Sequence, residues 1–411
     1  MTTTLSVQRI GTVKRIASRA TAKLAIKRPI SLAAAMKMIN LTSDNWSGAH
    51  PKISEALLRH CDGGATAYGA SVLDRKIERT FNEVFERDVA VFFVGTGTAA
   101  NALSMAYVNR AGGIIFAHRH AHLIEDECGA PEYFTGGARL VGVSGAEGRI
   151  EPEALEEAIQ RYPPNPVSVH AGRPMAVSIT QSTESGTLYS LAQIRRIANI
   201  AHSHGIPLHM DGARFANAMA ALGCTAAEMS WKSGVDILSF GASKNGCWCA
   251  EAILVFNDLQ QAHKDFPFLR KRAAHLFSKT RFIAAQFEAY FHDSLWLRNA
   301  RHANKMASHL TSAIRSLDPS VIRLAWTPQA NEVFVVMRRS VAETLRKSGE
   351  ISHFYEWNVP DGERRELKLH TEEGLFRLVT TFATKEAEVD EFASLLKAHY
   401  LGKSEQMRSI A

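Results

Sequence analysis

The chain has 411 residues and 46% apolar content, which is longer than one average domain and ordinary for a globular protein with a large core. Its formal charge of +7 is concentrated at one end: residues 1–38 hold eight Lys and Arg residues and no Asp or Glu, so removing those eight charges leaves about −1 for the remainder. This near-neutral body argues against nucleic-acid binding, and the lack of an apolar run of about 18 to 20 residues argues against a membrane span.

The first 38 residues are rich in Ser, Thr and Ala as well as in basic residues, a composition shared with organelle transit peptides. A disordered extension and a misplaced start codon, with Met36 and Met38 as later starts, are the alternatives. The five cysteines are scattered without a paired CxxC pattern, which suits a reducing compartment. We therefore expect a soluble, cytoplasmic protein, with organelle targeting by residues 1–38 left open.

Next along the chain, amphipathic segments at 52–60 and at about 73–85 predict two helices. Residues 90–94, AVFFV, then predict a buried strand that runs into the turn GTGT at 95–98 and a following helix. Strand, glycine-rich turn and helix in this order aim free backbone N–H groups at one point, which makes a site for a phosphate. Such turns are also common without any ligand, so the turn alone leaves both interpretations open.

A short apolar strand at 114–117 leads into HRHAHLIEDE, where His118, His120 and His122 alternate. Imidazoles at a spacing of two point to one side of a strand and could bind a metal. Arg119 lies within the cluster, however, and no further compact His or carboxylate motif completes a metal site. A structural histidine cluster, or a histidine that faces an aromatic cofactor, are the other two interpretations.

Strands and helices then alternate steadily, which predicts an α/β fold with a mostly parallel sheet. The expected strands are 140–143, 166–170, 176–180 and 206–210, and the expected helices are 152–161, 191–204 with Ser190 as its cap, and the segment after Asp211. In such sheets ligands bind beyond the carboxyl ends of the strands, and Asp211 lies at one of these ends.

Lys244 lies at a second strand end. The apolar run at 235–240 has strand length, and glycine and polar residues interrupt it where the lysine appears. Poor solvation lowers the pKa of an amine, so such a lysine can present a neutral nitrogen to a carbonyl group. A lysine that simply reaches solvent is the alternative.

The last third of the chain predicts a smaller α+β domain. The pattern is helical at 258–290, with a basic stretch, and at 295–317; strands are expected at 332–337 and 376–381, with helices at 341–347 and 385–399. The predicted organisation is a basic, disordered extension (1–38), a large α/β domain (39–290), a small α+β domain (291–400) and a tail (401–411).

These parts together match the needs of pyridoxal phosphate. Its phosphate needs N–H donors, its ring nitrogen needs an acid such as Asp211, and its aldehyde needs a lysine such as Lys244. An amino acid substrate also brings a carboxylate, which an arginine such as Arg214 can bind in bidentate fashion.

The sequence also resembles a known family, the threonine aldolases of the low-specificity type, within the beta-eliminating lyase group of aspartate-aminotransferase-like, fold type I enzymes. The resemblance covers about 41–396, and HMDGAR with SKNG at this separation is its most specific part. The matching motifs are SDN (43–45), AYG (67–69), GTGTAAN (95–101), AHLIEDECGA (121–130), HMDGAR (209–214), SFGASKNG (239–246), RAAHLFSK (272–279) and FRLVTTF (376–382).

The resemblance implies a role for each matching residue. Lys244 would form the Schiff base with pyridoxal phosphate, Asp211 would pair with the pyridine nitrogen, and His122 would stack on the ring and assist proton transfer. The phosphate would be bound by Gly97 and Thr98, joined by Arg272 and Lys279 from a neighbouring subunit of a homotetramer built as a dimer of dimers. The substrate carboxylate would be held by Ser43, Arg214 and Arg377.

One position departs from the family pattern. Where many members have a histidine in an ENTHNG-type turn, this chain has QSTESG at 181–186, which places Glu184 in the position of the histidine. A carboxylate can still accept the hydroxyl proton, so Glu184 and His122 are both candidate bases.

The expected reaction is cleavage of L-threonine, L-allo-threonine or a related β-hydroxy-α-amino acid to glycine and an aldehyde. The alternatives are another fold type I enzyme (a β-eliminating lyase or an aminotransferase), a metal-dependent hydrolase built on His118, His120 and His122, and a non-catalytic scaffold.

Overall fold

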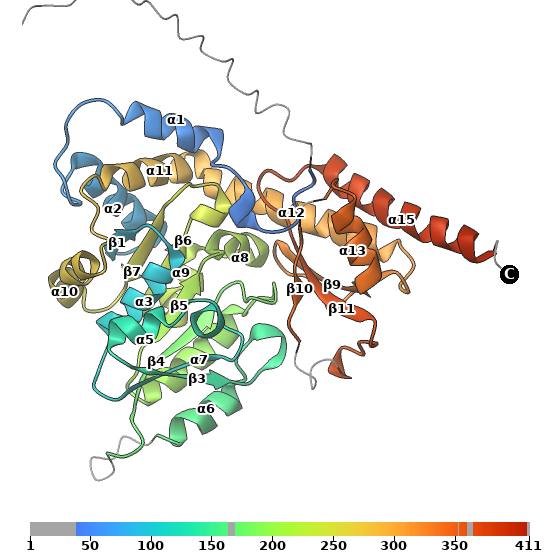
Figure 1. Ribbon diagram of the computed structural model, residues 1–411. Helices are drawn as coiled ribbons and strands as arrows, with labels where there is room; N and C mark the ends of the chain where they lie inside the picture. The colour runs from blue at the N-terminus through green and yellow to red at the C-terminus, as the bar shows by residue number, and fades with distance from the viewer. Residues whose placement is uncertain (1–37, 163–168, 352, 360–364, 409–411) are drawn as a thin grey trace, which may run out of the picture. The chain divides into compact units, whose positions relative to one another are not determined.

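The computed structural model describes residues 38–162, 169–351, 353–359 and 365–408, with backbone alone from residue 399 onward (Figure 1). Apart from Met38, the predicted basic extension lies outside these residues, and so does most of the strand expected at 166–170. Within the described ranges, no helix combines the length and the hydropathy that a membrane crossing requires.

The larger sheet has seven strands in the order β1-β7-β6-β5-β4-β2-β3. Neighbouring strands from β6 to β3 are parallel, whereas β7 is antiparallel to both β1 and β6. The mostly parallel α/β sheet predicted from the sequence is therefore confirmed, although the sequence analysis missed β7. The strands are β1 (Ala90–Val94), β2 (Gly113–His118), β3 (Arg139–Val143), β4 (Arg173–Thr180), β5 (Leu208–Gly212), β6 (Ile237–Gly241) and β7 (Glu251–Val255).

Two successive residues of β1 show how helices cover both faces of this sheet. Phe93 packs on Phe287 of α11 (Arg281–Phe291), with ring centroids 5.5 Å apart. Its neighbour Phe92 points to the other face and stacks on Phe266 of α10 (Leu259–Arg272) at 4.4 Å. Successive side chains of a strand point to opposite faces, so a strand buried on both sides is apolar throughout.

Six of the remaining helices of this part of the chain match predicted segments, and a side-chain cap marks the start of four of them, whereas three short helices at 122–125, 130–135 and 226–229 were not predicted. Ser190 forms the predicted cap of α7, in a capping box with Gln193. One difference lies at 258–290, where the helical pattern divides into α10 and α11 with a connection at 273–280. The other helices are α1 (Pro51–Arg59), α2 (Val72–Val84), α3 (Gly97–Tyr107), α4 (His122–Glu125), α5 (Ala130–Thr135), α6 (Pro152–Gln160), α7 (Leu191–Ser203), α8 (Phe215–Leu222) and α9 (Ala226–Met229).

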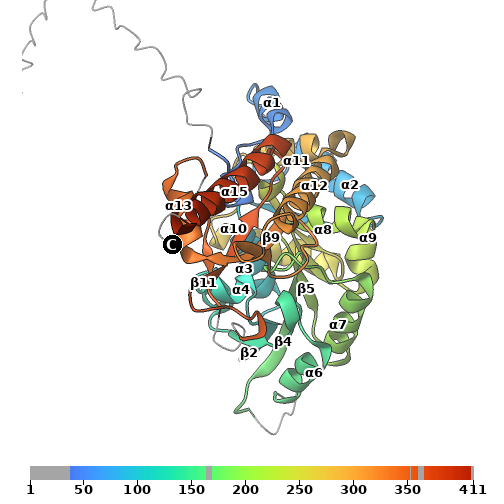
Figure 2. The same cartoon turned by 90° about the vertical axis from the view of Figure 1, so that its right-hand side faces the viewer.

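The C-terminal third forms a second, antiparallel sheet in the order β10-β11-β9-β8. Helices α12 and α15 lie side by side in both views (Figure 2). Ile39 and Leu41, which the sequence analysis places in the large domain, pack in the core of this second sheet. The elements are α12 (Leu295–Arg315), β8 (Ile322–Leu324), β9 (Glu332–Arg338), α13 (Arg339–Lys347), β10 (Glu356–Trp357), β11 (Glu373–Val379) and α15 (Glu386–Arg408), and the exact domain boundaries stay a prediction.

The strand directions fix where a ligand site can form. Strands β2, β4, β5 and β6 are parallel, and β1 runs in the same direction as β6 because both are antiparallel to β7. Their carboxyl ends therefore meet at one edge of the sheet. Thr180 pairs with Asp211 and Asp211 with Ser239 at this edge, which is the expected place for a ligand in an open α/β sheet.

Candidate active site

A cavity of about 310 Å³ lies at this edge, at the small end of the size range of ligand pockets. It is lined by the ends of the large sheet and by two residues of the second sheet, Trp357 and Arg377. Eight of the eleven residues predicted for the site line it: Gly97, Thr98, His122, Glu184, Asp211, Arg214, Lys244 and Arg377.

Lys244 lies three residues beyond β6, in a 3-10 turn that spans Ser243–Asn245. The turn is fixed to the protein core by Asn245, whose side chain donates hydrogen bonds to the Tyr290 hydroxyl and to the Trp296 carbonyl, both at 2.8 Å. Burial, followed by the positive charge of Arg214, holds the pKa of Lys244 below its usual value. The predicted neutral amine is therefore favoured by its surroundings.

Asp211 lies near the end of β5, and its carboxylate is held on both oxygens. The Asn101 side-chain amide donates to Oδ2 at 2.7 Å, and the Ala213 N–H donates to Oδ1 at 2.9 Å. Asn101 also donates to Glu127 at 2.7 Å. The orientation of Asp211 is thus fixed before any ligand arrives.

His122 begins α4, and its ring is fixed by a carboxylate that the sequence analysis did not single out. Its Nδ1 lies 2.9 Å from Oε1 of Glu127, whose side chain is buried. The hydrogen bond to Glu127 raises the pKa of His122. Glu127 was part of the quoted motif AHLIEDECGA, but nothing in its spacing distinguished it from Glu125 or Asp126.

Glu184 is one of two acids of the cavity whose pKa is raised to about 7 by burial, the other being Glu251. Its Oε1 accepts hydrogen bonds from the His122 N–H at 2.7 Å and from the Thr180 hydroxyl at 2.9 Å. Its Oε2 is buried and has no hydrogen-bond partner among the described residues. Burial raises the pKa of Glu184 to about 7, so near neutral pH this carboxyl can both bind and release a proton.

The predicted phosphate turn has the expected form. Thr96 caps α3 by accepting the N–H of Ala99, and the helix begins at Gly97. The first N–H groups of a helix have no acceptor within the helix, so Gly97 and Thr98 bring free donors and the positive end of the helix dipole to the cavity wall.

Three predicted residues do not line the cavity. Arg272 and Lys279 are exposed, near the end of α10 and in the connection that follows. Ser43 is buried, and its hydroxyl accepts the Asn45 N–H. The roles expected for these residues stay predictions, and for Arg272 and Lys279 they concern a neighbouring subunit.

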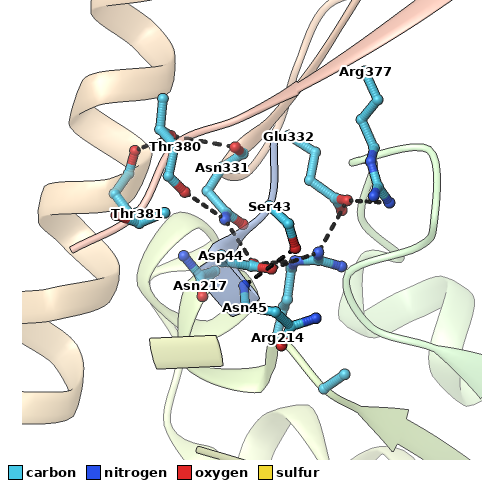
Figure 3. Close-up of polar contacts among 12 residues, drawn as sticks. Ser43, Asp44, Asn45, Arg214, Asn217, Asn331, Glu332, Arg377, Thr380 and Thr381 are labelled. Carbon is cyan, nitrogen blue, oxygen red and sulfur yellow. Dashed lines mark hydrogen bonds and ion pairs between the residues drawn. The ribbon is translucent and has the colours of Figure 1, made fainter. Parts of the chain in front are cut away.

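The two predicted carboxylate-binding arginines meet acidic partners that the sequence analysis missed (Figure 3). Arg214 donates through Nε and Nη2 to Asp44, at 2.7 and 3.1 Å. Its Nη2 is also 3.2 Å from Oε1 of Glu332, the first residue of β9. Nη1 of Arg377 lies 3.5 Å from the same oxygen, and the Arg377 guanidinium lies over the Trp357 ring at 5.2 Å.

The histidines that suggested a metal are used in other ways. Nε2 of His118 lies 3.1 Å from the Gly145 carbonyl oxygen, and the backbone N–H of His120 donates to Nδ1 of His118. His122 pairs with Glu127 instead. In the described part of the chain, no group of three or more His, Cys, Asp or Glu side chains is arranged to hold a metal ion, so the hydrolase alternative gains no support.

These donors fit pyridoxal phosphate. The amine of Lys244, the carboxylate of Asp211, the imidazole of His122 and the N-terminus of α3 all line one cavity. They match, respectively, the aldehyde, ring nitrogen, ring face and phosphate of that cofactor.

Comparisons with known proteins agree with this geometry. The model of the beta-eliminating lyase family matches residues 40–340. A low specificity L-threonine aldolase of a Pseudomonas species is 38% identical, over 87% of this chain and 96% of its own length. The enzyme of that name from Pseudomonas aeruginosa is also 38% identical, over 75% and 86%. The solved threonine aldolase structure from Leishmania major superimposes with a TM-score of 0.77 at 27% identity, covering 87% of this chain and 98% of that one.

Proposed function

This chain belongs to the beta-eliminating lyase family, and from that premise we propose that it is a pyridoxal-phosphate-dependent aldehyde-lyase of the threonine aldolase type. Its substrates are L-threonine, L-allo-threonine or related β-hydroxy-α-amino acids, which it cleaves to glycine and an aldehyde. The observation that carries the proposal is the convergence of Lys244, Asp211 and Glu184 on one cavity. When bound, the cofactor supplies an electron sink for the bond that breaks at the α-carbon.

The residues of the cofactor side each have a defined task. Lys244 offers a neutral nitrogen to the aldehyde, because its burial disfavours the ammonium form. Asp211, oriented by Asn101, holds a proton at the ring nitrogen. His122, fixed by Glu127, supplies the flat partner for the ring.

On the substrate side, Arg377 and Arg214 bind the carboxylate, with Ser43 as the third predicted contact. Glu184 accepts the proton of the β-hydroxyl group, for which its pKa of about 7 and its unpartnered Oε2 suit it. Of the two candidate bases we favour Glu184 over His122, because Glu127 raises the pKa of His122 and favours its protonated form.

We further propose a cytoplasmic homotetramer, built as a dimer of dimers, that acts on small molecules. The exposed positions of Arg272 and Lys279, outside the cavity of their own chain, support their reaching a phosphate in a neighbouring subunit. The five unpaired cysteines support a reducing compartment. Light scattering tests the assembly, and an active monomer would contradict it.

The catalytic proposal is tested by a substitution and a product assay. Purified wild-type protein loaded with pyridoxal phosphate should show visible absorbance and release glycine from threonine, and Lys244→Ala should lose both. Lys232→Ala is the matched control, because Lys232 is an exposed lysine paired with Glu86. From threonine, 2-oxobutanoate with ammonia would identify a β-eliminating lyase instead, and a keto acid without free ammonia an aminotransferase.

A further inference from the structure

The carboxylate of Glu332 lies between the two arginines that would bind the substrate (Figure 3). Its side chain is completely buried, and a single oxygen, Oε1, faces Nη2 of Arg214 at 3.2 Å and Nη1 of Arg377 at 3.5 Å. The second oxygen, Oε2, is also buried and has no hydrogen-bond partner among the described residues. Glu332, an acid of the small sheet, thus contacts both arginines of the proposed carboxylate site.

We propose that Glu332 is a specificity-determining residue, which restricts the arginine pair to ligands that carry a single carboxylate. This inference rests on the proposed function, because it takes Arg214 and Arg377 as the carboxylate receptor. Asp44 and Glu332 oppose the two arginines in charge, so the four-residue cluster is formally neutral. One carboxylate is then bound by directional N–H donors, whereas a second finds no unopposed cation.

Arg214 is held by contacts other than the one with Glu332. Asp44 already holds the Nε and Nη2 edge of Arg214 with two hydrogen bonds, and Asn331 donates to Asp44 at 3.2 Å. The side chains of Asp44, Arg214 and Asn331 are all buried, so the Asp44–Arg214 ion pair is shielded from solvent. Removal of the Glu332 charge should therefore leave Arg214 in place.

The position of Arg377 has its own supports as well. Its backbone is fixed by the pairing of β11 with β9, opposite Phe334, and its guanidinium lies over the Trp357 ring. What Glu332 adds at this point is a negative charge beside a guanidinium that lines the cavity. We therefore expect Glu332 to affect ligand binding through its charge and not by holding Arg377 in position, as a structural ion pair would.

The test compares two four-carbon ligands, butyrate with one carboxylate and succinate with two. Their dissociation constants are measured on the cofactor-loaded protein by calorimetry and by tryptophan fluorescence, to which the cavity-lining Trp248 and Trp357 contribute. Glu332→Gln should tighten succinate relative to butyrate by about 10- to 100-fold, the size expected when the second carboxylate lies roughly 6 to 12 Å from the removed charge near a protein surface.

Two further variants separate charge from folding and shape. Glu332→Asp keeps the charge and should retain the wild-type ratio. Glu373→Gln removes a buried carboxylate paired with Arg323 in the same sheet, outside the cavity, and should also leave the ratio unchanged.

An unchanged ratio in Glu332→Gln, equal weakening of both ligands, or the same shift in Glu332→Asp would overturn the inference. Threonine cleavage is assayed separately on the wild type. If the wild type cleaves threonine but Glu332→Gln leaves the ratio of the succinate and butyrate dissociation constants unchanged, only this inference is refuted. If the ratio shifts but the wild type does not cleave threonine, the proposed function is refuted and the charge selectivity of the cavity is retained.

Discussion

Replacement of Glu184 by glutamine should move stability and activity in opposite directions. The carboxyl is buried beside the cavity, with a pKa of about 7 in place of the ordinary 4.5. Glutamine has the same shape, and its carbonyl oxygen can keep the hydrogen bonds from the His122 N–H and the Thr180 hydroxyl. The substitution therefore removes one titratable proton and little else.

The sign of the stability effect follows from the direction of the pKa change. As pH rises from 4.5 to 7, the unfolded chain releases this proton while the folded chain retains it, so the free energy of unfolding of the wild type falls. The full loss, reached above pH 7, is on the order of 3 kcal/mol. Glu184→Gln has no such proton to retain, so it does not lose this stability as pH rises. The variant should therefore be more stable than the wild type by up to about 3 kcal/mol at pH 8 and by less than about 1 kcal/mol at pH 5.

Activity should change the other way. The wild-type kcat should rise with pH through about 7, where Glu184 becomes ionised, and then level off. In Glu184→Gln the kcat should be about 10²- to 10⁴-fold lower and lack this ionisation.

Thermal unfolding at several pH values and a pH profile of glycine release check both effects in the same preparations. Glu157→Gln, on the exposed surface of α6, is the control and should change neither quantity. A Glu184→Gln variant with wild-type kcat would refute the assignment of the base. A stability difference that is constant with pH would refute the account of its buried, titrating carboxyl.

Three further substitutions test other parts of the structure. Asp211→Asn should lower kcat by about 10²-fold or more while the protein stays folded by circular dichroism, and undiminished activity would argue against its place at the ring nitrogen. Glu127→Gln should lower the pKa of His122, which histidine NMR titration measures; an unchanged value would contradict the 2.9 Å contact. Phe240→Ala, at the centre of the aromatic core, should cost about 3 to 5 kcal/mol of unfolding free energy, whereas Tyr133→Ala on the surface should stay within about 0.5 kcal/mol; equal thermal shifts would contradict this packing.

Local patterns account for the parts of the fold that the sequence predicted well. The apolar runs at β1, β5 and β6 each end in glycine or polar residues, and the helices carry capping residues such as Ser190. The antiparallel strand β7 was missed because its five residues, EAILV, form a short run that begins with a charged residue and follows the Lys244 turn closely. Its position between β1 and β6 depends on long-range pairing, which no local pattern specifies.

The residues of the site also divide into those that local sequence patterns indicate and those that only the tertiary fold brings together. Lys244 and Asp211 stand at strand ends, and Glu184 takes the position of a histidine in the family pattern, so the sequence could place all three at one edge of the sheet. Asp44, Glu127 and Glu332 are single carboxylates whose importance comes from packing. Glu332 lies 118 residues along the chain from Arg214 and 45 from Arg377, and only the fold brings the three together.

The most direct test of the central claim is a product balance. Purified wild-type protein, loaded with pyridoxal phosphate, is incubated with L-threonine, and glycine, acetaldehyde, ammonia and keto acids are measured in the same samples. The structure predicts glycine and acetaldehyde in equal amounts, with neither ammonia nor a keto acid. Ammonia or a keto acid in place of glycine would contradict the account.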